Sequence, residues 1–141
     1  MDIISNNELN IDVLSKIFSD AAMEFTKDDD DELYIKGDDV EFPFWVSYSA
    51  ENEVIKIFTY ATMKDGVSRV DALEFVNNAN GEIILPSFAI KESDSRFYMY
   101  GYYYMPTKFG IDKRALITNA RRFSSAFRFA ATLDEEDIFF E

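Results

Sequence analysis

The side chains best suited to chemistry in this sequence are the carboxylates that follow the first apolar segment. The run Asp28–Glu32 contains four adjacent aspartates and a glutamate. Such oxygens bind calcium in a loop that has glycine at its sixth position and glutamate at its twelfth. Counted from Asp28, these positions hold Leu33 and Asp39, so the run departs from the calcium motif where the loop geometry depends on it. Adjacent like charges also disfavour regular structure, and we interpret the run as a solvated loop or strand tip.

Other catalytic and metal-binding chemistry is limited by the composition. The sequence has no histidine and no cysteine, which removes the commonest general base, the commonest metal ligand and every thiolate site. Ser124 and Ser125 therefore have no histidine to activate them, and the five glycines are too scattered to form a phosphate-binding loop. The carboxylates lie in hydrophilic runs, where their pKa values should stay ordinary. We predict no catalytic residue, no cofactor and no metal centre.

The charge of the chain restricts its partners. The formal net charge is −13, which repels phosphate backbones and anionic lipids, so we expect neither nucleic acid nor a membrane as partner. The charge then has two interpretations: it provides solubility, or it attracts a basic or partly unfolded protein. The first residues lack the pattern of a signal peptide, and no apolar stretch approaches the roughly 20 residues that span a bilayer, so we expect a cytoplasmic protein.

Three segments have the apolar spacing of helices. Ile11, Leu14, Ile17 and Phe18 recur at helical intervals and predict a helix over 11–23, with Asn10 as its N-cap. A second helix is predicted over 68–79, opened by a serine and stopped by an Asn-Gly pair. A third is predicted over 112–137. Acids at 134–137 oppose the helix dipole, so this last helix should fray or end before them.

Strands are predicted between these helices. Alternating and β-branched residues indicate strands at 33–35, 42–49, 54–63, within 82–90, and at 95–105. The element order α-β-β-β-α-β-β-α predicts an α+β fold with a five-stranded antiparallel sheet packed against helices. We expect one domain over residues 1–141, with its core at about 11–133.

The fifth predicted strand is unusually aromatic. Period two places Tyr98, Tyr100, Tyr102 and Tyr104 on one face of it. The strand is either a central one whose tyrosines turn their hydroxyls toward water, or part of an exposed aromatic surface. Tyrosine is enriched in interfaces, and we predict that Tyr98, Tyr100 and Tyr102 contact a partner.

The last predicted helix carries two apolar stripes. One runs through Leu116, Ala120, Phe123, Phe127 and Ala130, and suits the core. Beside it lies a second stripe, Ala126, Phe129 and Leu133, for which we predict self-association in a homodimer. The arginines of this helix form a solvated face, or they complement the acidic region of a second subunit.

Several of these segments resemble the YbjN family of bacterial sensory-transduction regulators. The resemblance is carried by Leu73 to Asn78, which includes Val76-Asn77-Asn78, by Ile83 to Phe88 and by Phe97 to Tyr104, and it covers roughly 12–133. That family is similar in fold to class I type III secretion chaperones, which are small, acidic, cytoplasmic homodimers. The resemblance implies a chaperone-like fold and a protein-binding role, and it implies no catalytic residue.

Three functions remain open at this point. The leading hypothesis is a non-catalytic regulator or chaperone-like adaptor that binds a protein. The second is an acidic immunity protein that neutralises a basic toxin, which the run Asp28–Asp31 suggests. The third is an unrecognised small-molecule-binding protein or enzyme, which would need a deep pocket with convergent polar groups. Strong salt dependence of binding would favour the second over the first.

Overall fold

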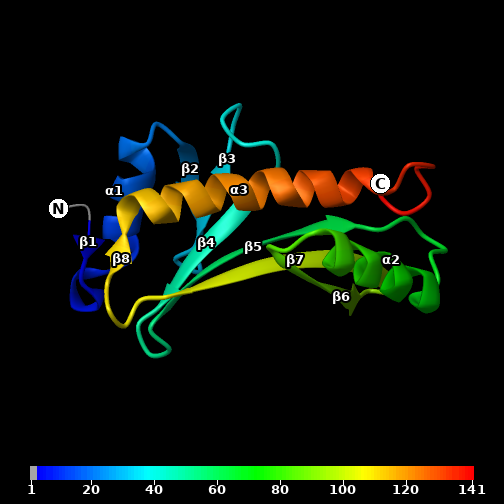
Figure 1. Cartoon of the computed structure of the whole chain (residues 1–141), viewed down its shortest axis with the longest axis horizontal. Helices are drawn as coiled ribbons and strands as arrows, with labels where there is room; N and C mark the ends of the chain where they lie inside the picture. Colours follow the sequence, from blue (N-terminus) through cyan, green and yellow to red (C-terminus); the bar gives the residue numbers. More distant parts are fainter. Residues whose placement is uncertain (1–2) are drawn as a thin grey trace.

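The computed structural model describes residues 3–141, and its main feature is an antiparallel sheet with helices on one face (Figure 1). The elements are β1 (Ile3–Ile4), a 3-10 turn (Asn6–Glu8), α1 (Ile11–Asp20), β2 (Glu24–Lys27), β3 (Leu33–Lys36), β4 (Phe44–Ser49), β5 (Val54–Thr62), α2 (Arg69–Glu82), β6 (Ser87–Ser93), β7 (Arg96–Pro106), β8 (Ile111–Asp112) and α3 (Lys113–Thr132). The main sheet has the order β2-β3-β4-β5-β7-β6, and β1 pairs with β8. The predicted α+β class and order are confirmed, with three short strands added.

The five-stranded prediction was wrong by one strand, because β2 joins the main sheet. Its sequence, Glu24 to Lys27, is short and mostly exposed, and it pairs with β3 only at the sheet edge. Only one side chain of this edge strand is partly buried, so its sequence shows no alternation of apolar and polar residues. The ribbon of β1 and β8 has two residues in each strand and was missed for the same reason.

Local side chains set where the helices begin and end. The Asn10 side chain accepts a hydrogen bond from the Val13 amide, and Ser68 accepts one from the Asp71 amide, as expected of N-caps. The first helix ends at Asp20 rather than at position 23, because Ala22 adopts a positive φ that turns the chain into β2. The predicted stop at the Asn-Gly pair was wrong: α2 continues to Glu82.

The helix α3 joins the two halves of the core. It runs along the long axis of the molecule, with α1 near its beginning and α2 beside its second half (Figure 1). Its predicted core stripe, Leu116 to Ala130, is fully buried, with Phe123 in a cluster under α1 and Phe127 in a second cluster under α2. No helix formed by residues 3–141 has the length and apolar character needed to cross a membrane.

The chain after α3 folds back instead of extending the helix to 137. The Asp134 carboxylate accepts hydrogen bonds from the amides of Ile138, Phe139 and Phe140. The two phenylalanines pack against Phe75 of α2, with ring centroids 4.7 and 5.2 Å away. The early end of the helix agrees with the unfavourable acids at its C-terminus.

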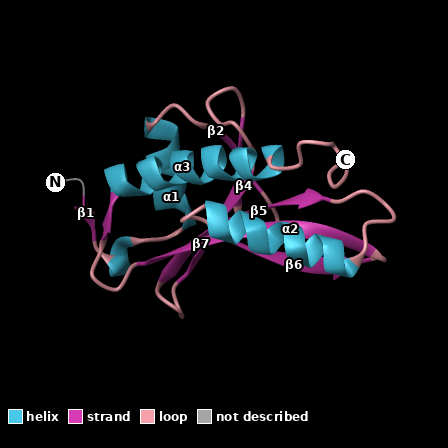
Figure 2. Ribbon diagram, turned by 45° about the vertical axis from the view of Figure 1, so that its right-hand side comes forward, coloured by secondary structure: helices cyan, strands magenta, loops and turns pink. Residues whose placement is uncertain are grey.

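Every helix lies on the same face of the sheet, as Figure 2 shows. This covered face carries residues such as Phe44, Ile57 and Met99, which are fully buried under the helices. Gly101 of β7 lies here as well, and a Cβ at this position would lie 2.7 Å from the Phe127 ring. The glycine therefore allows the close approach of α3 to β7.

Candidate functional site

The opposite face of the sheet is covered by no helix from residues 3–141 and is lined by aromatic rings. We call it the aromatic face, and it consists of Tyr34, Trp45, Phe58, Tyr60, Tyr98, Tyr100, Tyr102 and Tyr104. These residues come from four neighbouring strands, β3, β4, β5 and β7. Their strand positions alternate with those of the buried residues, so the period-two pattern of the sequence places all of them on one side.

The strand register aligns these rings in rows across the sheet. Tyr34 lies opposite Trp45, Trp45 opposite Phe58, and Phe58 opposite Tyr102. In the next row, Tyr60 lies opposite Tyr100. Cross-strand pairs of this kind are the main side-chain contribution to sheet stability. The rows convert single aromatic residues, far apart in the sequence, into one surface.

Ring contacts connect the rows into a continuous network. Trp45 stacks on Phe58 and Tyr60, with centroid distances of 5.9 and 5.5 Å. Tyr100 stacks on Tyr102 at 5.4 Å, and Tyr102 meets Tyr104 at 5.8 Å. These distances are those of favourable aromatic pairs. The network fixes the positions of the rings relative to one another.

Two lysines supply the positive charge on this face. The Lys91 Nζ lies 3.9 Å from the centroid of the Tyr100 ring, and the Lys56 Nζ lies 4.5 Å from that of Phe58. Neither lysine forms an ion pair within residues 3–141. Burial and the charges of Asp28 and Asp30 raise the pKa of Glu32 overall, and the nearby Lys56 ammonium lowers it in part. Two ammonium groups thus lie over rings of the aromatic face, with the Glu32 carboxyl near Lys56 and Tyr100.

Tyr100 is the most enclosed residue of the network. Its side chain is 9% exposed, and its hydroxyl is buried without a hydrogen-bond partner in residues 3–141. Burial first, then the neighbours Tyr102 and Glu32, raise the pKa of Tyr100 to about 12. Leaving such a hydroxyl without a partner costs roughly 1–3 kcal/mol. The ring therefore supports its neighbours more than it offers surface.

The predicted partner residues lie together, but the most accessible rings are different ones. Tyr98 and Tyr102 are half-buried. Tyr60 and Tyr104 are 46% and 49% exposed. Tyr104 ends the network next to Tyr102, whereas Tyr60 lies between Trp45 and Tyr98. The sequence-based prediction of partner residues did not include four other rings of this face, namely Tyr34, Trp45, Phe58 and Tyr60. The alternation of β4 and β5 does carry the signal for them, but only the strand order shows that they adjoin β7.

The residues predicted for self-association occupy three different environments. Phe129 is 53% exposed and Ala126 is half-buried. Leu133 is also half-buried, and it packs against the core cluster under α2. Their role in a homodimer stays a prediction.

The acidic run forms the turn between β2 and β3. The Asp28 carboxylate accepts hydrogen bonds from the amides of Asp30 and Glu32, at 3.0 and 2.9 Å, which closes the turn. Carboxylate oxygens of these three residues lie within 4.8 Å of one another. Partial burial and the charges of Asp28 and Asp30 raise the pKa of Glu32. The predicted strand tip is thus stabilised by one of its own aspartates.

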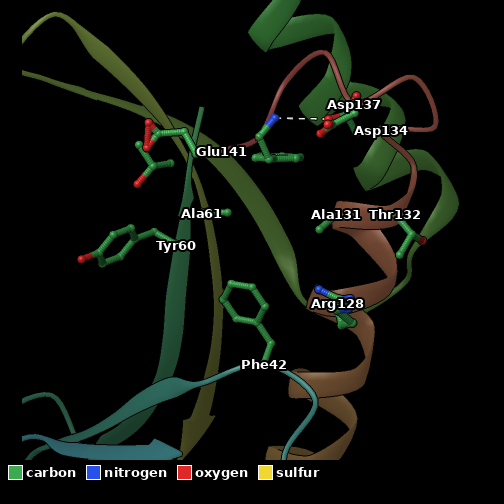
Figure 3. A pocket seen from close by; sticks show the side chains of 11 residues that line it. Phe42, Tyr60, Ala61, Arg128, Ala131, Thr132, Asp134, Asp137 and Glu141 are labelled. Atoms are coloured by element: carbon green, nitrogen blue, oxygen red, sulfur yellow. Dashed lines mark hydrogen bonds between the residues drawn. The ribbon is translucent and has the colours of Figure 1, made fainter. Parts of the chain in front are cut away.

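A cavity of about 480 Å³ opens between β5 and the end of α3 (Figure 3). Arg128 lines this cavity, and the acidic residues that line it have structural partners. Asp134 holds the backbone turn described above, Asp137 lies 3.6 Å from Lys64, and Glu141 lies 2.6 Å from Arg96. These pairings account for the carboxylates of the cavity without a catalytic role.

Ser124 also has a structural partner. Its hydroxyl is buried, accepts a hydrogen bond from the Phe42 amide and donates one to the Phe42 carbonyl, both at 2.7 Å. The hydroxyl thus fixes the chain before β4 to α3. It is used fully by the backbone and is not presented to solvent as a nucleophile would be.

Comparison with solved structures shows which folds this architecture resembles. YbjN from E. coli, described as a putative transcription regulator, has a TM-score of 0.79 and 10% identity over 94% of this chain and 96% of its own. An uncharacterized protein from Methanothermobacter thermautotrophicus has a TM-score of 0.66 and 11% identity, over 92% and 99%. A chain of the HopA1-SchA chaperone-effector complex has a TM-score of 0.57 and 13% identity, over 88% and 91%.

These similarities confirm the expected chaperone-like fold, since identities this low bear on fold alone. A search of curated proteins gives no match. The family model described as "Putative bacterial sensory transduction regulator", YbjN, matches residues 10–135. Neither the family description nor the fold indicates a catalytic class. The match covers most of the chain, and the protein therefore belongs to the YbjN family.

Proposed function

We propose that this protein is a non-catalytic regulatory adaptor that binds a protein partner through its aromatic face. The observation that carries the proposal is a sheet face without a helix, lined by a connected network of rings from four strands. Contiguous exposed aromatic surface of this kind is typical of protein-binding sites. The family description as a regulator and the likeness to a chaperone–effector complex support the same conclusion.

The chemistry of the face defines the partner segment. Tyrosine and tryptophan side chains bury roughly 150–250 Å² each, so an apolar segment that covers several rings gains most of its affinity from them. Lys56 and Lys91 lie over the rings and form no ion pair with the residues that the structure describes, and they favour carboxylates in the partner. The expected partner segment is apolar with acidic residues. We also propose a cytoplasmic location, which the family description as bacterial regulators supports.

The test compares exposed rings on and off the aromatic face. Immobilised protein is used to capture partners from a bacterial cytoplasmic extract, and the captured proteins are identified and then purified. Binding should fall at least tenfold in the double variant Tyr60→Ala/Tyr104→Ala, because both rings are about half exposed. Phe109→Ala is the matched control, since Phe109 is 94% exposed in the loop before β8. Equal losses in both variants would reject the aromatic face as the binding surface.

The predicted residues Tyr98, Tyr100 and Tyr102 are tested in the same assay. Tyr100 is enclosed by its neighbours, so Tyr100→Ala should weaken binding partly by disordering the network. Tyr98→Ala and Tyr102→Ala remove half-buried rings and should each have a smaller effect. Unchanged capture by all three variants would contradict their assignment to partner contact.

An inhibitor of a basic toxin is the second candidate function. The observation that favours it is the convergence of three carboxylates on the turn between β2 and β3. Exposed charge pairs are screened over about 8 Å at physiological salt and about 3 Å at 1 M, so this function predicts binding that 1 M salt abolishes. Binding to the aromatic face should instead survive in high salt. Loss of a salt-sensitive binding in Asp29→Asn/Asp30→Asn would favour the inhibitor.

A further inference from the structure

The end of β5 has an open edge that the last residues of the chain occupy. The pairing of β4 stops opposite the middle of β5, so the rest of β5 has no neighbouring strand from residues 3–141 on that side. Residues 137–141, which we call the strap, return from α3 to this edge (Figure 3). The Glu141 amide donates to the Thr62 carbonyl at 3.2 Å, and the Lys64 amide donates to the Phe139 carbonyl at 2.6 Å. The strap thus pairs with the end of β5 as a short antiparallel strand would.

Rings and charges fix the position of the strap along this edge. Its two phenylalanines pack against Phe75 of α2. Before them, the Asp137 carboxylate lies 3.6 Å from the Lys64 ammonium. After them, the Glu141 carboxylate lies 2.6 Å from the Arg96 guanidinium. The groove under the strap therefore fits an extended segment that carries an acid, two adjacent rings and a second acid.

The strap is held by contacts near the surface. Phe139 and Phe140 are half-buried, and the side chains of residues 137, 138 and 141 are exposed. Exposed ion pairs contribute little to stability, and segments with few buried apolar contacts open locally more often than the whole chain unfolds. The family model ends at residue 135, so the groove is formed by residues inside the family match and the strap by residues outside it.

We propose that the groove under the strap binds a segment of a partner protein, and that the strap competes with this segment. The segment pairs with the open edge of β5 and carries two adjacent aromatic residues between acids, as the strap does. When the strap opens, Lys64 and Arg96 lose its carboxylates, although Asp65 stays 3.2 Å from Arg96, and both cations favour acids in the new segment. The strap is tethered at a high effective concentration, and it lowers the apparent affinity of the partner. Binding in this groove does not require the aromatic face.

Amide hydrogen exchange of the wild type, followed by NMR, tests whether the strap opens. The Lys64 amide is bonded to the strap, whereas the neighbouring Met63 amide is bonded to the Phe97 carbonyl of β7 at 2.9 Å. Opening of the strap exposes the first amide and not the second, so the protection factor of Lys64 should be at least tenfold smaller. Equal protection of the two amides would mean that the strap opens only when the whole chain unfolds, and would overturn the proposal.

A labelled synthetic peptide with the sequence of residues 134–141 tests the groove itself. In the full-length variant Phe139→Ser/Phe140→Ser the strap loses the rings that hold it, so this variant should bind the peptide at least tenfold more tightly than the wild type. Ile138→Ser is the matched control, because this strap residue is 52% exposed, and it should bind the peptide as the wild type does. Fluorescence anisotropy over roughly 1–1,000 µM protein measures all three. Equal binding by the three proteins would overturn the proposal, as would no binding by a double variant that circular dichroism shows to be folded.

Discussion

The two faces of the main sheet are both rich in apolar side chains, but they differ in how well those side chains tolerate contact with water. The covered face presents Phe44, Ile57 and Met99, which have no strong polar atoms and lie fully buried under helices. The aromatic face presents Trp45 and tyrosines, which combine a large apolar ring with one hydrogen-bonding group. Amphipathic rings are stable at a boundary with water and still gain free energy when covered. The difference is consistent with one face that stabilises the fold and another that, as we propose, binds a partner.

Phe44 and Tyr60 separate the two faces most clearly. Phe44→Ala should lower the free energy of unfolding by about 3–5 kcal/mol, because it opens a cavity under α3. Tyr60→Ala should cost about 1 kcal/mol at most, because its ring is 46% exposed and packs against the rings of Trp45 and Tyr98 rather than in the core. Urea denaturation followed by circular dichroism measures both. Similar losses would show that the aromatic face belongs to the folding core.

Gly101 tests how tightly the covered face is packed. Gly101→Ala should destabilise the protein by about 1–3 kcal/mol, since the new methyl group would lie 2.7 Å from the Phe127 ring. Gly81→Ala is the matched control, because an added Cβ there meets nothing within 4 Å and the residue lies in α2. The control should be neutral or stabilising. A neutral Gly101→Ala in the same urea titration would mean that α3 can move away from β7 at little cost.

These contrasts also show how far the sequence alone could go. The alternation in β5 places Thr59 and Tyr60 on opposite faces correctly, because side-chain direction follows from period two. The alternation could not predict how deeply Tyr100 is buried. Its burial depends on the Phe58 ring from β5, which packs against it, and on Lys91 from β6, which lies over its ring. Nor could the alternation find β2 or the return of Phe139 against Phe75, since both depend on tertiary contacts and not on a local pattern. Local periodicity predicts faces, while sheet order and enclosure come from the whole fold.

The hydroxyl of Tyr100 is buried like a core atom, although the residue belongs to the aromatic face. Tyr100→Phe should raise the free energy of unfolding by about 1 kcal/mol, because it removes a buried hydroxyl without a partner in residues 3–141. Tyr104→Phe, at a ring that is 49% exposed, should change little. Urea titrations of both variants at pH 7 measure the difference. A destabilised Tyr100→Phe would show that the hydroxyl has a partner in solution.

The pH dependence of the same variant provides a second measurement. The folded pKa of Tyr100 is about 12, above the usual value of about 10 for an unfolded chain. The unfolded state therefore loses this proton first, and the stability that the protonated form provides declines as the pH rises from about 10 to about 12. Tyr100→Phe should lose less stability than the wild type over this window. Parallel curves would mean that Tyr100 titrates like an exposed tyrosine.

Lys91 should give the smallest effect. Lys91→Gln removes an ammonium group 3.9 Å from the Tyr100 ring centroid. Lys91 itself is exposed, and a cation–ring contact of an exposed cation contributes about 0.5–1 kcal/mol. Removing any lysine also makes this acidic chain more negative, so a control of equal charge is needed. Lys108→Gln provides it, because that ammonium lies 5.6 Å from the Phe109 ring in an exposed loop. A larger loss at Lys91 in low and high salt alike would assign the effect to the ring contact. Equal losses of stability in the two variants that disappear at high salt would assign the effect to net charge. Lys91 would then be able to contact a partner without a loss of folding stability.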